Sequence, residues 1–299
     1  MSNPWRRAHR RALKNGESSY IDPQTGFHVF TEIGLARRGC CCGSGCRHCP
    51  YQHESMSLAD RAARGKQPSW LTAHTAPAEP ADVLFWSGGK DSFLALRALH
   101  REGLHPIVLL TTFDVATRTV AHQEIHIDAV IRQAEHLGLP LLGVPLHPGE
   151  TYMDRIRTAC ELVPRIARLV FGDLHLLHIR EWRGVAFREF AADRGAALHF
   201  PVWGVPYDTL ITDLEASGAT CEVSAVTEAA EGIVAVGERF DRAMMARLPG
   251  GIDPFGENGE FHTLVKVWEG ASPQGAVATT GAGPSHGTQC RGEGGSAAS

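Results

Sequence analysis

The chain has 299 residues, of which 43% are hydrophobic, so it is long enough for one domain of about 200 residues and a smaller module. Its net charge is −4, but residues 1–50 carry 8 Lys and Arg against 3 Asp and Glu, so only the N-terminal part is basic. No apolar stretch reaches membrane-spanning length and the N-terminus lacks the apolar core of a signal peptide, which argues against a membrane protein and predicts a cytoplasmic one.

The N-terminal part predicts a small folded module. Its basic run from Arg6 to Lys14 favours a solvated helix face over a nucleic-acid contact, so nucleic acid is a possible but not a favoured partner. Residues 20–31 alternate in hydrophobicity around a Pro- and Gly-containing turn, which predicts strand, turn, strand. We place this module at residues 1–55 and a Pro- and Ala-rich linker at residues 56–81.

Five of the 8 cysteines fall within residues 40–49, a clustering typical of metal sites. Cys46 and Cys49 form a C-x-x-C knuckle, and Cys41 and Cys42 are close enough to complete four sulfur ligands for Zn²⁺ or an iron–sulfur cluster. Unliganded thiols are the alternative. Arg47 and His48 could adjust the charge of the thiolates without binding the metal themselves. The stretch C-C-x-x-x-C-R-H-C-P-Y resembles a small cysteine-rich family called oxidoreductase-like, and that resemblance implies no reaction.

The stretch Ser87-Gly88-Gly89-Lys90-Asp91-Ser92 predicts an anion-binding turn between a buried strand at 83–86 and a helix through 93–99. Paired glycines allow close backbone approach, and the start of a helix offers unpaired N–H groups. Lys90 adds a cation, the serines add hydroxyl donors, and Asp91 would either bind Mg²⁺ or cap the helix. An ordinary capped turn is the alternative.

S-G-G-x-D-S after a strand resembles the pyrophosphate loop (PP-loop) of the N-type ATP pyrophosphatases. That resemblance implies that ATP is held at residues 87–92 and is cleaved to AMP and pyrophosphate.

Strand and helix signals alternate through residues 82–200: strands at 106–111, 139–144 and 168–171, and a helix at 124–137. This alternation predicts an α/β fold with a doubly wound, Rossmann-like parallel sheet. Ligands bind at the carboxyl edge of such sheets, which should gather Ser87, Thr111, Thr112 and Asp173. The two threonines could contact adenine or simply close a strand, and Asp173 could serve in acid–base or metal chemistry or act as a cap.

Residues 201–268 predict a smaller C-terminal α+β subdomain, with a break at 201–206, a helix through 210–215 and a strand at 264–267. The Gly-rich loop at 251–263 carries Glu257, Glu260 and His262, and its carboxylates could bind Mg²⁺, orient an amine or accept its proton. Residues 269–299 have little that can pack and predict a disordered tail.

Four motifs together, S-G-G-K-D-S, F-G-D-x-x-x-x-H-I-R, P-x-W-G and G-E-N-G-E-F-H-T, are similar to the diphthine–ammonia ligase family of ATP pyrophosphatases over residues 82–268. The resemblance implies ATP-dependent amidation with Mg²⁺: a carboxylate is adenylated with release of pyrophosphate, and ammonia then displaces AMP. Relatives often carry E-G-G-E-F-E-T in the last motif, so Asn258 and His262 are departures that leave the carboxylate acceptor open.

The predicted catalytic residues are Lys90, Asp91, Asp173, Glu257 and Glu260. ATP-binding residues are Ser87, Gly88, Gly89, Lys90, Asp91, Ser92, Thr111 and Thr112, and acceptor-binding residues are Trp203, Gly256, Asn258, His262 and Thr263. Metal ligands are Cys41, Cys42, Cys46 and Cys49. Two other functions stay open: an ATP-dependent tRNA-modifying enzyme of the thiolation type, and a non-catalytic nucleotide-binding sensor or scaffold.

Overall fold

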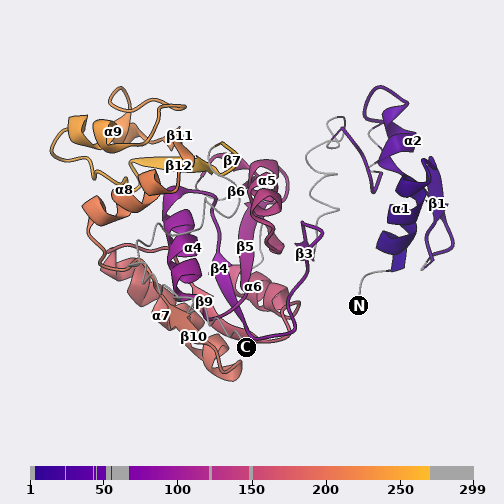
Figure 1. Ribbon diagram of the computed structural model, residues 1–299, viewed down its shortest axis with the longest axis horizontal. Helices are drawn as coiled ribbons and strands as arrows, with labels where there is room; N and C mark the ends of the chain where they lie inside the picture. The colour runs from indigo at the N-terminus through magenta and orange to yellow at the C-terminus, as the bar shows by residue number, and fades with distance from the viewer. Residues whose placement is uncertain are drawn as a thin grey trace, which may run out of the picture.

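A computed structural model describes residues 4–23, 25–42, 44, 46–51, 55, 67–120, 123–147 and 151–269 (Figure 1). Among these residues, none of the helices combines the length and apolarity needed to cross a membrane. The predicted tail beyond residue 269 and most of the predicted linker lie outside the described residues.

The N-terminal module combines two helices and a hairpin. The hairpin confirms the strand, turn, strand predicted at 20–31, and its strands pair Tyr20 with Val29. Thr31 begins the second helix by accepting a hydrogen bond from Gly34 N. Ala12, Tyr20 and Leu35 are buried between these elements. The elements are α1 (Pro4–Lys14), β1 (Ser19–Ile21), β2 (His28–Phe30) and α2 (Glu32–Ala36).

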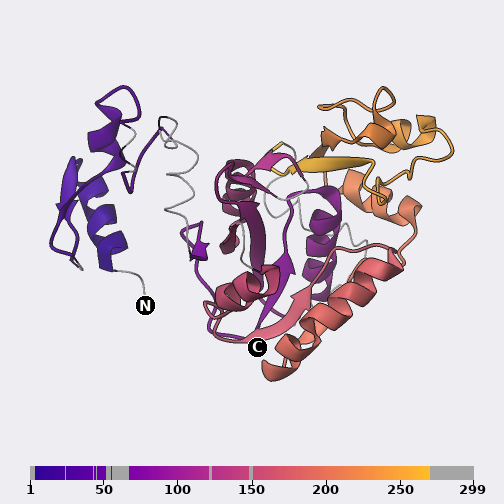
Figure 2. The ribbon, with the colours of Figure 1, turned by 180° about the vertical axis from the view of Figure 1, so that it is seen from behind.

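A mostly parallel sheet forms the centre of the larger part of the chain (Figures 1 and 2). Its parallel strands follow the spatial order β10-β9-β4-β5-β8. From β4 the chain adds β5 and β8 on one side and then β9 and β10 on the other, so the strand order reverses at β4. This order agrees with the predicted α/β, Rossmann-like sheet, in which ligands generally bind at the carboxyl end of the strand where the order reverses, here β4. The parallel strands are β4 (Ala81–Phe85), β5 (Ile107–Asp114), β8 (Leu141–Leu146), β9 (Ile166–Val170) and β10 (Ala197–His199).

Three short antiparallel strands extend this sheet. One of them pairs Trp70 with Leu142 of β8, so the sheet begins inside the range predicted as a linker. Two others continue the sheet from the end of β5, and the second of them lies where the sequence predicted the start of a helix at residue 124. Glu124 has φ +51°, which a helix does not permit, so the helix begins only after His126. These strands are β3 (Ser69–Trp70), β6 (Thr119–Val120) and β7 (Ile125–His126).

Helices cover both faces of the sheet. Successive strand residues point to opposite sides, so apolar strands present apolar side chains on both faces. Val83 packs with α6 and α7, whereas Leu84 packs with α4, α5 and α8. Helix α6 was not predicted from the sequence. These helices are α4 (Lys90–Glu102), α5 (Ile127–Leu137), α6 (Tyr152–Cys160), α7 (Leu177–Asp193) and α8 (Tyr207–Ala216).

The C-terminal region adds a two-stranded antiparallel sheet that packs beside α4 (Figure 1). Val265 belongs to the same apolar cluster as Leu94 of α4 and Ala134 of α5, so this region shares the core that lies on one face of the large sheet. Only its second strand was predicted. The elements are β11 (Thr220–Val226), the 3₁₀ turn η1 (Glu228–Ala230), α9 (Arg242–Arg247) and β12 (Phe261–Lys266).

Candidate functional site

The predicted phosphate loop, residues 87–92, joins β4 to α4 at the carboxyl edge of the sheet. Gly89 caps α4 without a side-chain hydrogen bond, and Lys90 is the first helical residue. The Ser92 hydroxyl donates to Gly89 O at 3.0 Å, and the Ser87 hydroxyl accepts from Gly89 N at 3.3 Å. The loop therefore has the open helix start and the hydroxyl groups that an anion cradle needs.

The two glycines are required because other segments approach the loop closely. Gly88 has φ +84°, and a Cβ there would lie 2.8 Å from Gln133 Oε1. A Cβ on Gly89 would lie 2.9 Å from the backbone oxygen of Thr263. A larger residue at either position would push away α5 or β12.

Strand β12 and helix α5 hold the phosphate loop from the C-terminal side. The Thr263 hydroxyl accepts from Lys90 N at 3.1 Å, and Val265 N donates to Gly88 O at 3.0 Å. Gln133 Nε2 donates both to Gly88 O at 2.8 Å and to Val265 O at 2.7 Å. Residues distant in the sequence thus satisfy two backbone groups of this loop, Gly88 O and Lys90 N.

A cavity of about 320 Å³ opens in front of the loop. The loop, the ends of β5 and β9, helices α6 and α7 and the start of β12 line it. The predicted site residues that line it are Ser87, Lys90, Asp91, Ser92, Thr112, Asp173, Gly256, Glu257, His262 and Thr263. The structure therefore gathers the loop, the end of β9 and the 256–263 segment around one space.

Lys90, Asp91 and Glu257 form the charged centre of this cavity. Lys90 Nζ lies 2.9 Å from Asp91 Oδ2 and is stacked over the ring of Phe255. Burial alone would lower the pKa of Lys90, but the negative charges of Asp91 and Glu257 raise it. Burial and the negative charge of Asp91 raise the pKa of Glu257 to about 8. A carboxyl group that titrates near neutral pH is suited to acid–base chemistry.

Asp91 is the residue of this cavity that best fits a magnesium ligand. Burial raises the pKa of this carboxyl group although Lys90 acts in the opposite direction. Its Oδ1 is buried and has no hydrogen-bond partner among the residues that the structure describes. An unpartnered carboxylate oxygen beside a phosphate cradle fits Mg²⁺, which prefers a few carboxylate ligands together with phosphate oxygens.

Asp173 is held by Arg183 rather than left free. Arg183 Nε donates to Asp173 Oδ2 at 2.5 Å and Nη2 donates to Oδ1 at 3.2 Å, while the guanidinium stacks on Phe171. Next to it, a Cβ on Gly172 would lie 2.8 Å from Asp91 O, so this glycine lets β9 approach α4. Asp173 and Arg183 together present a paired anion and cation to the cavity.

The remaining predicted residues lie outside the cavity lining. Glu260 is buried, and its Oε1 accepts from Asp253 N at 2.9 Å and from Asn258 Nδ2 at 3.2 Å. Glu260 and Asn258 thus shape the loop from behind. Thr111 is buried in β5, and Trp203 stacks under Arg180, 4.6 Å from its guanidinium carbon.

Several residues of the site were not predicted from the sequence. Gln133 is a buried amide on an otherwise apolar helix face, and this contrast is a signal that could have identified it. Tyr207 donates to Asp253 at 2.8 Å and contacts His175 Nε2 at 2.9 Å. Asp253 in turn accepts from Glu257 N at 3.2 Å, so this chain of contacts holds the backbone of Glu257. These roles depend on contacts between distant segments, and no local pattern encodes them.

The sulfur atoms of the four cysteines predicted as metal ligands lie close together two by two, without disulfide bonds. Cys42 and Cys46 have sulfur atoms 3.4 Å apart, and Cys41 and Cys49 have theirs 3.9 Å apart. Among the described residues, no three of these sulfurs converge on one point. Hydrogen bonds from Ser44 lower the pKa of Cys42 to about 7, and burial raises that of Cys46. The predicted four-sulfur site is therefore not assembled in this structure.

Two family models match the chain. Residues 81–190 match the diphthamide synthase N-terminal domain, and residues 8–55 match a family of unknown function (DUF5522). The first match fits the N-type ATP pyrophosphatases, the class that the 87–92 loop resembles, and supports an ATP-using enzyme. Among solved structures, a predicted subunit of tRNA methyltransferase from Methanocaldococcus jannaschii is 18% identical, with a TM-score of 0.34 over 62% of this chain and 96% of that chain.

Proposed function

We propose that the chain is an ATP-dependent amide ligase of the diphthine–ammonia ligase type. It would adenylate a substrate carboxylate with release of pyrophosphate and then release AMP when ammonia attacks. One observation carries this proposal: the phosphate loop and the raised-pKa carboxyl group of Glu257 face the same cavity. A loop that only bound nucleotide would have no use for a proton acceptor opposite the phosphates.

The first half-reaction uses the loop side of the cavity. A carboxylate oxygen of the acceptor forms a bond to the α-phosphorus of ATP, and the bond from that phosphorus to the oxygen bridging the β-phosphate breaks. Pyrophosphate leaves with the electron pair. The start of α4 and the charge of Lys90 stabilise the negative charge that develops on it. Bound at Asp91 Oδ1, Mg²⁺ would neutralise phosphate charge.

The second half-reaction uses the opposite side. The nitrogen of ammonia attacks the acyl carbon, the bond from that carbon to the adenylate oxygen breaks, and AMP leaves. Glu257 takes the proton that nitrogen must lose, because its raised pKa makes the carboxylate a stronger base than an ordinary Glu. Asp253 fixes the backbone of Glu257 and so holds it in place.

The test is product analysis with ATP labelled in its α-phosphate, incubated with the protein, an extract of the source cells and ¹⁵N-ammonium. We expect AMP and pyrophosphate, with ¹⁵N incorporated in proportion to AMP. Lys90→Met should abolish both signals, whereas Lys266→Ala, which removes a half-buried Lys paired with Glu222, should abolish neither. ADP as product would refute adenylation. AMP formation that ribonuclease abolishes would favour the tRNA-modifying alternative instead.

A further inference from the structure

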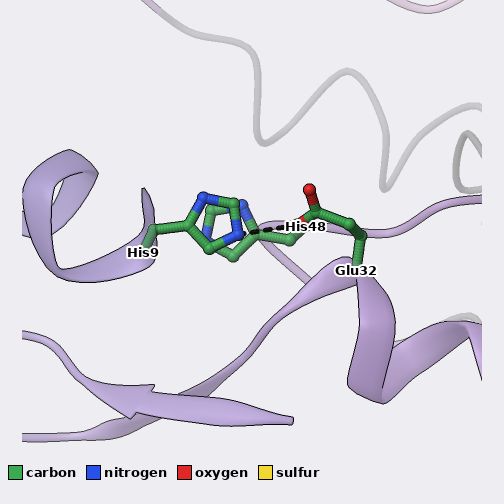
Figure 3. Close-up of side chains that lie close together, drawn as sticks. All are labelled: His9, Glu32 and His48. Carbon is green, nitrogen blue, oxygen red and sulfur yellow. Dashed lines mark hydrogen bonds and ion pairs between the residues drawn. The ribbon is translucent and has the colours of Figure 1, made fainter. Parts of the chain in front are cut away.

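Three side chains with metal-binding groups, none of them a cysteine, meet in the N-terminal module (Figure 3). His9 comes from α1, Glu32 is the first residue of α2, and His48 lies in the turn between Cys46 and Cys49. One ligand atom from each lies within 4.8 Å of the other two. We propose that His9, Glu32 and His48 bind a divalent first-row transition-metal ion.

The geometry brings the donor atoms together without a metal. His9 Nε2 lies 2.6 Å from Glu32 Oε2, and the rings of His9 and His48 stack 3.5 Å apart at an angle of 4°. A cation that bound here would replace the hydrogen bond between His9 and Glu32, and the two rings would tilt apart to direct their nitrogens at it. The side chain of Glu32 is 43% exposed, so an ion can reach the site from solvent.

A second layer of contacts holds His48. The Tyr20 hydroxyl lies 3.0 Å from His48 Nε2, and Arg47 Nη1 donates to the same hydroxyl at 3.2 Å. Arg47 also donates to the buried carboxylate of Asp22 at 2.7 Å. Such outer contacts orient ligating histidines in metal proteins, and their presence distinguishes this cluster from a chance meeting of surface groups.

The donor set selects the kind of metal. Two imidazole nitrogens and one carboxylate oxygen suit Zn²⁺, Co²⁺ or Fe²⁺, whereas Mg²⁺ and Ca²⁺ prefer oxygen ligands throughout. Three protein ligands also leave coordination positions for water or a substrate. On this proposal the C-R-H-C turn serves the metal by placing His48, and the neighbouring thiols are not ligands of this ion.

The test titrates the reduced full-length protein with Co²⁺ and then with Zn²⁺ as competitor. Co²⁺ reports its ligands, because thiolate coordination adds an intense charge-transfer band that imidazole and carboxylate ligands lack. We expect one Co²⁺ with visible ligand-field bands and no thiolate band. Glu32→Gln should weaken binding at least about tenfold, since even outer-shell changes cost that much at metal sites. His28→Gln, which alters an exposed histidine in β2 of the same module, should leave Co²⁺ binding unchanged.

Two further variants keep the outcome decisive. Replacing Cys42 and Cys46 by Ser should leave the Co²⁺ spectrum as it is. Unchanged affinity in Glu32→Gln, no Co²⁺ binding by the wild type, or a thiolate band that the Cys variants abolish would each overturn the proposal. Circular dichroism confirms that each variant is folded. Lys90→Met should bind Co²⁺ normally, so this test is independent of the ligase activity.

Discussion

The hydroxyl group of Thr263 offers the sharpest test of how β12 supports the phosphate loop. Thr263→Val keeps the shape of the side chain but removes the oxygen that accepts from Lys90 N at 3.1 Å. That N–H belongs to the first turn of α4, where no side chain of the N-cap residue satisfies it. The substitution therefore leaves a buried donor without its partner.

The expected cost follows from burial. Thr263 is 2% exposed and Lys90 is 3% exposed, so water has little access to this hydrogen bond. An unsatisfied buried polar group costs about 1–3 kcal/mol, which is a change of roughly 5- to 150-fold in the unfolding equilibrium. Thr263→Ser keeps the hydroxyl and loses only a methyl group, at a cost of about 0.8 kcal/mol. The valine variant should therefore be the less stable of the two.

Urea unfolding of the wild type and the two variants measures this difference, and cleavage of ATP to AMP measures its effect on the site. We expect the serine variant to retain activity and the valine variant to lose most of it, because the first turn of α4 shifts. If the valine variant were as stable as the serine variant and equally active, the proposed support by β12 would be wrong.

Three other changes probe the site. Lys90→Met should weaken ATP binding by about 10- to 100-fold in a titration, because a charge-assisted contact to phosphate is lost. Amide formation should rise as pH increases through about 8, where Glu257 becomes a carboxylate able to accept a proton, and the pH–rate profile of Glu257→Gln should lose this rise. Gly172→Ala should lower the free energy of unfolding by about 1–3 kcal/mol, because the new Cβ would lie 2.8 Å from Asp91 O. Gly184→Ala adds a Cβ with no described atom within 4 Å and should raise the free energy of unfolding by about 0.5–1 kcal/mol. Thermal unfolding measures both changes.

The elements that were predicted correctly have local signals. The 87–92 loop has a buried strand before it and a helical pattern after it, and both signals lie within a few residues of the glycines. Helix α6 was not predicted, because its nine residues mix charged and apolar types and it gains its stability by packing on the sheet. Strand β11 alternates between half-buried and buried residues, a pattern that was readable from Thr220 to Val226 but was not used.

In the N-terminal module, spacing along the chain does not determine which side chains come together. The distance between Cys46 and Cys49 along the chain allows them to share a metal, yet each sulfur lies next to another partner: Cys42 and Cys41. His48 was expected to act on these thiolates, and the structure instead stacks its ring on His9, 39 positions earlier. A contact across that separation depends on how α1 packs against the hairpin, which no local pattern specifies.

The phosphate loop is hydrogen-bonded to the strand that continues from the 256–263 segment, which was predicted to contact the acceptor. Strand β12 carries Thr263, which binds Lys90 N, and Val265, which binds Gly88 O, while the residues just before it carry Glu257 into the cavity. A displacement of that segment therefore moves two hydrogen-bond partners of the loop at the same time. In this arrangement the groups proposed to hold ATP and the group proposed to accept a proton cannot be positioned independently, so a substitution in one half must be judged by its effect on both proposed half-reactions.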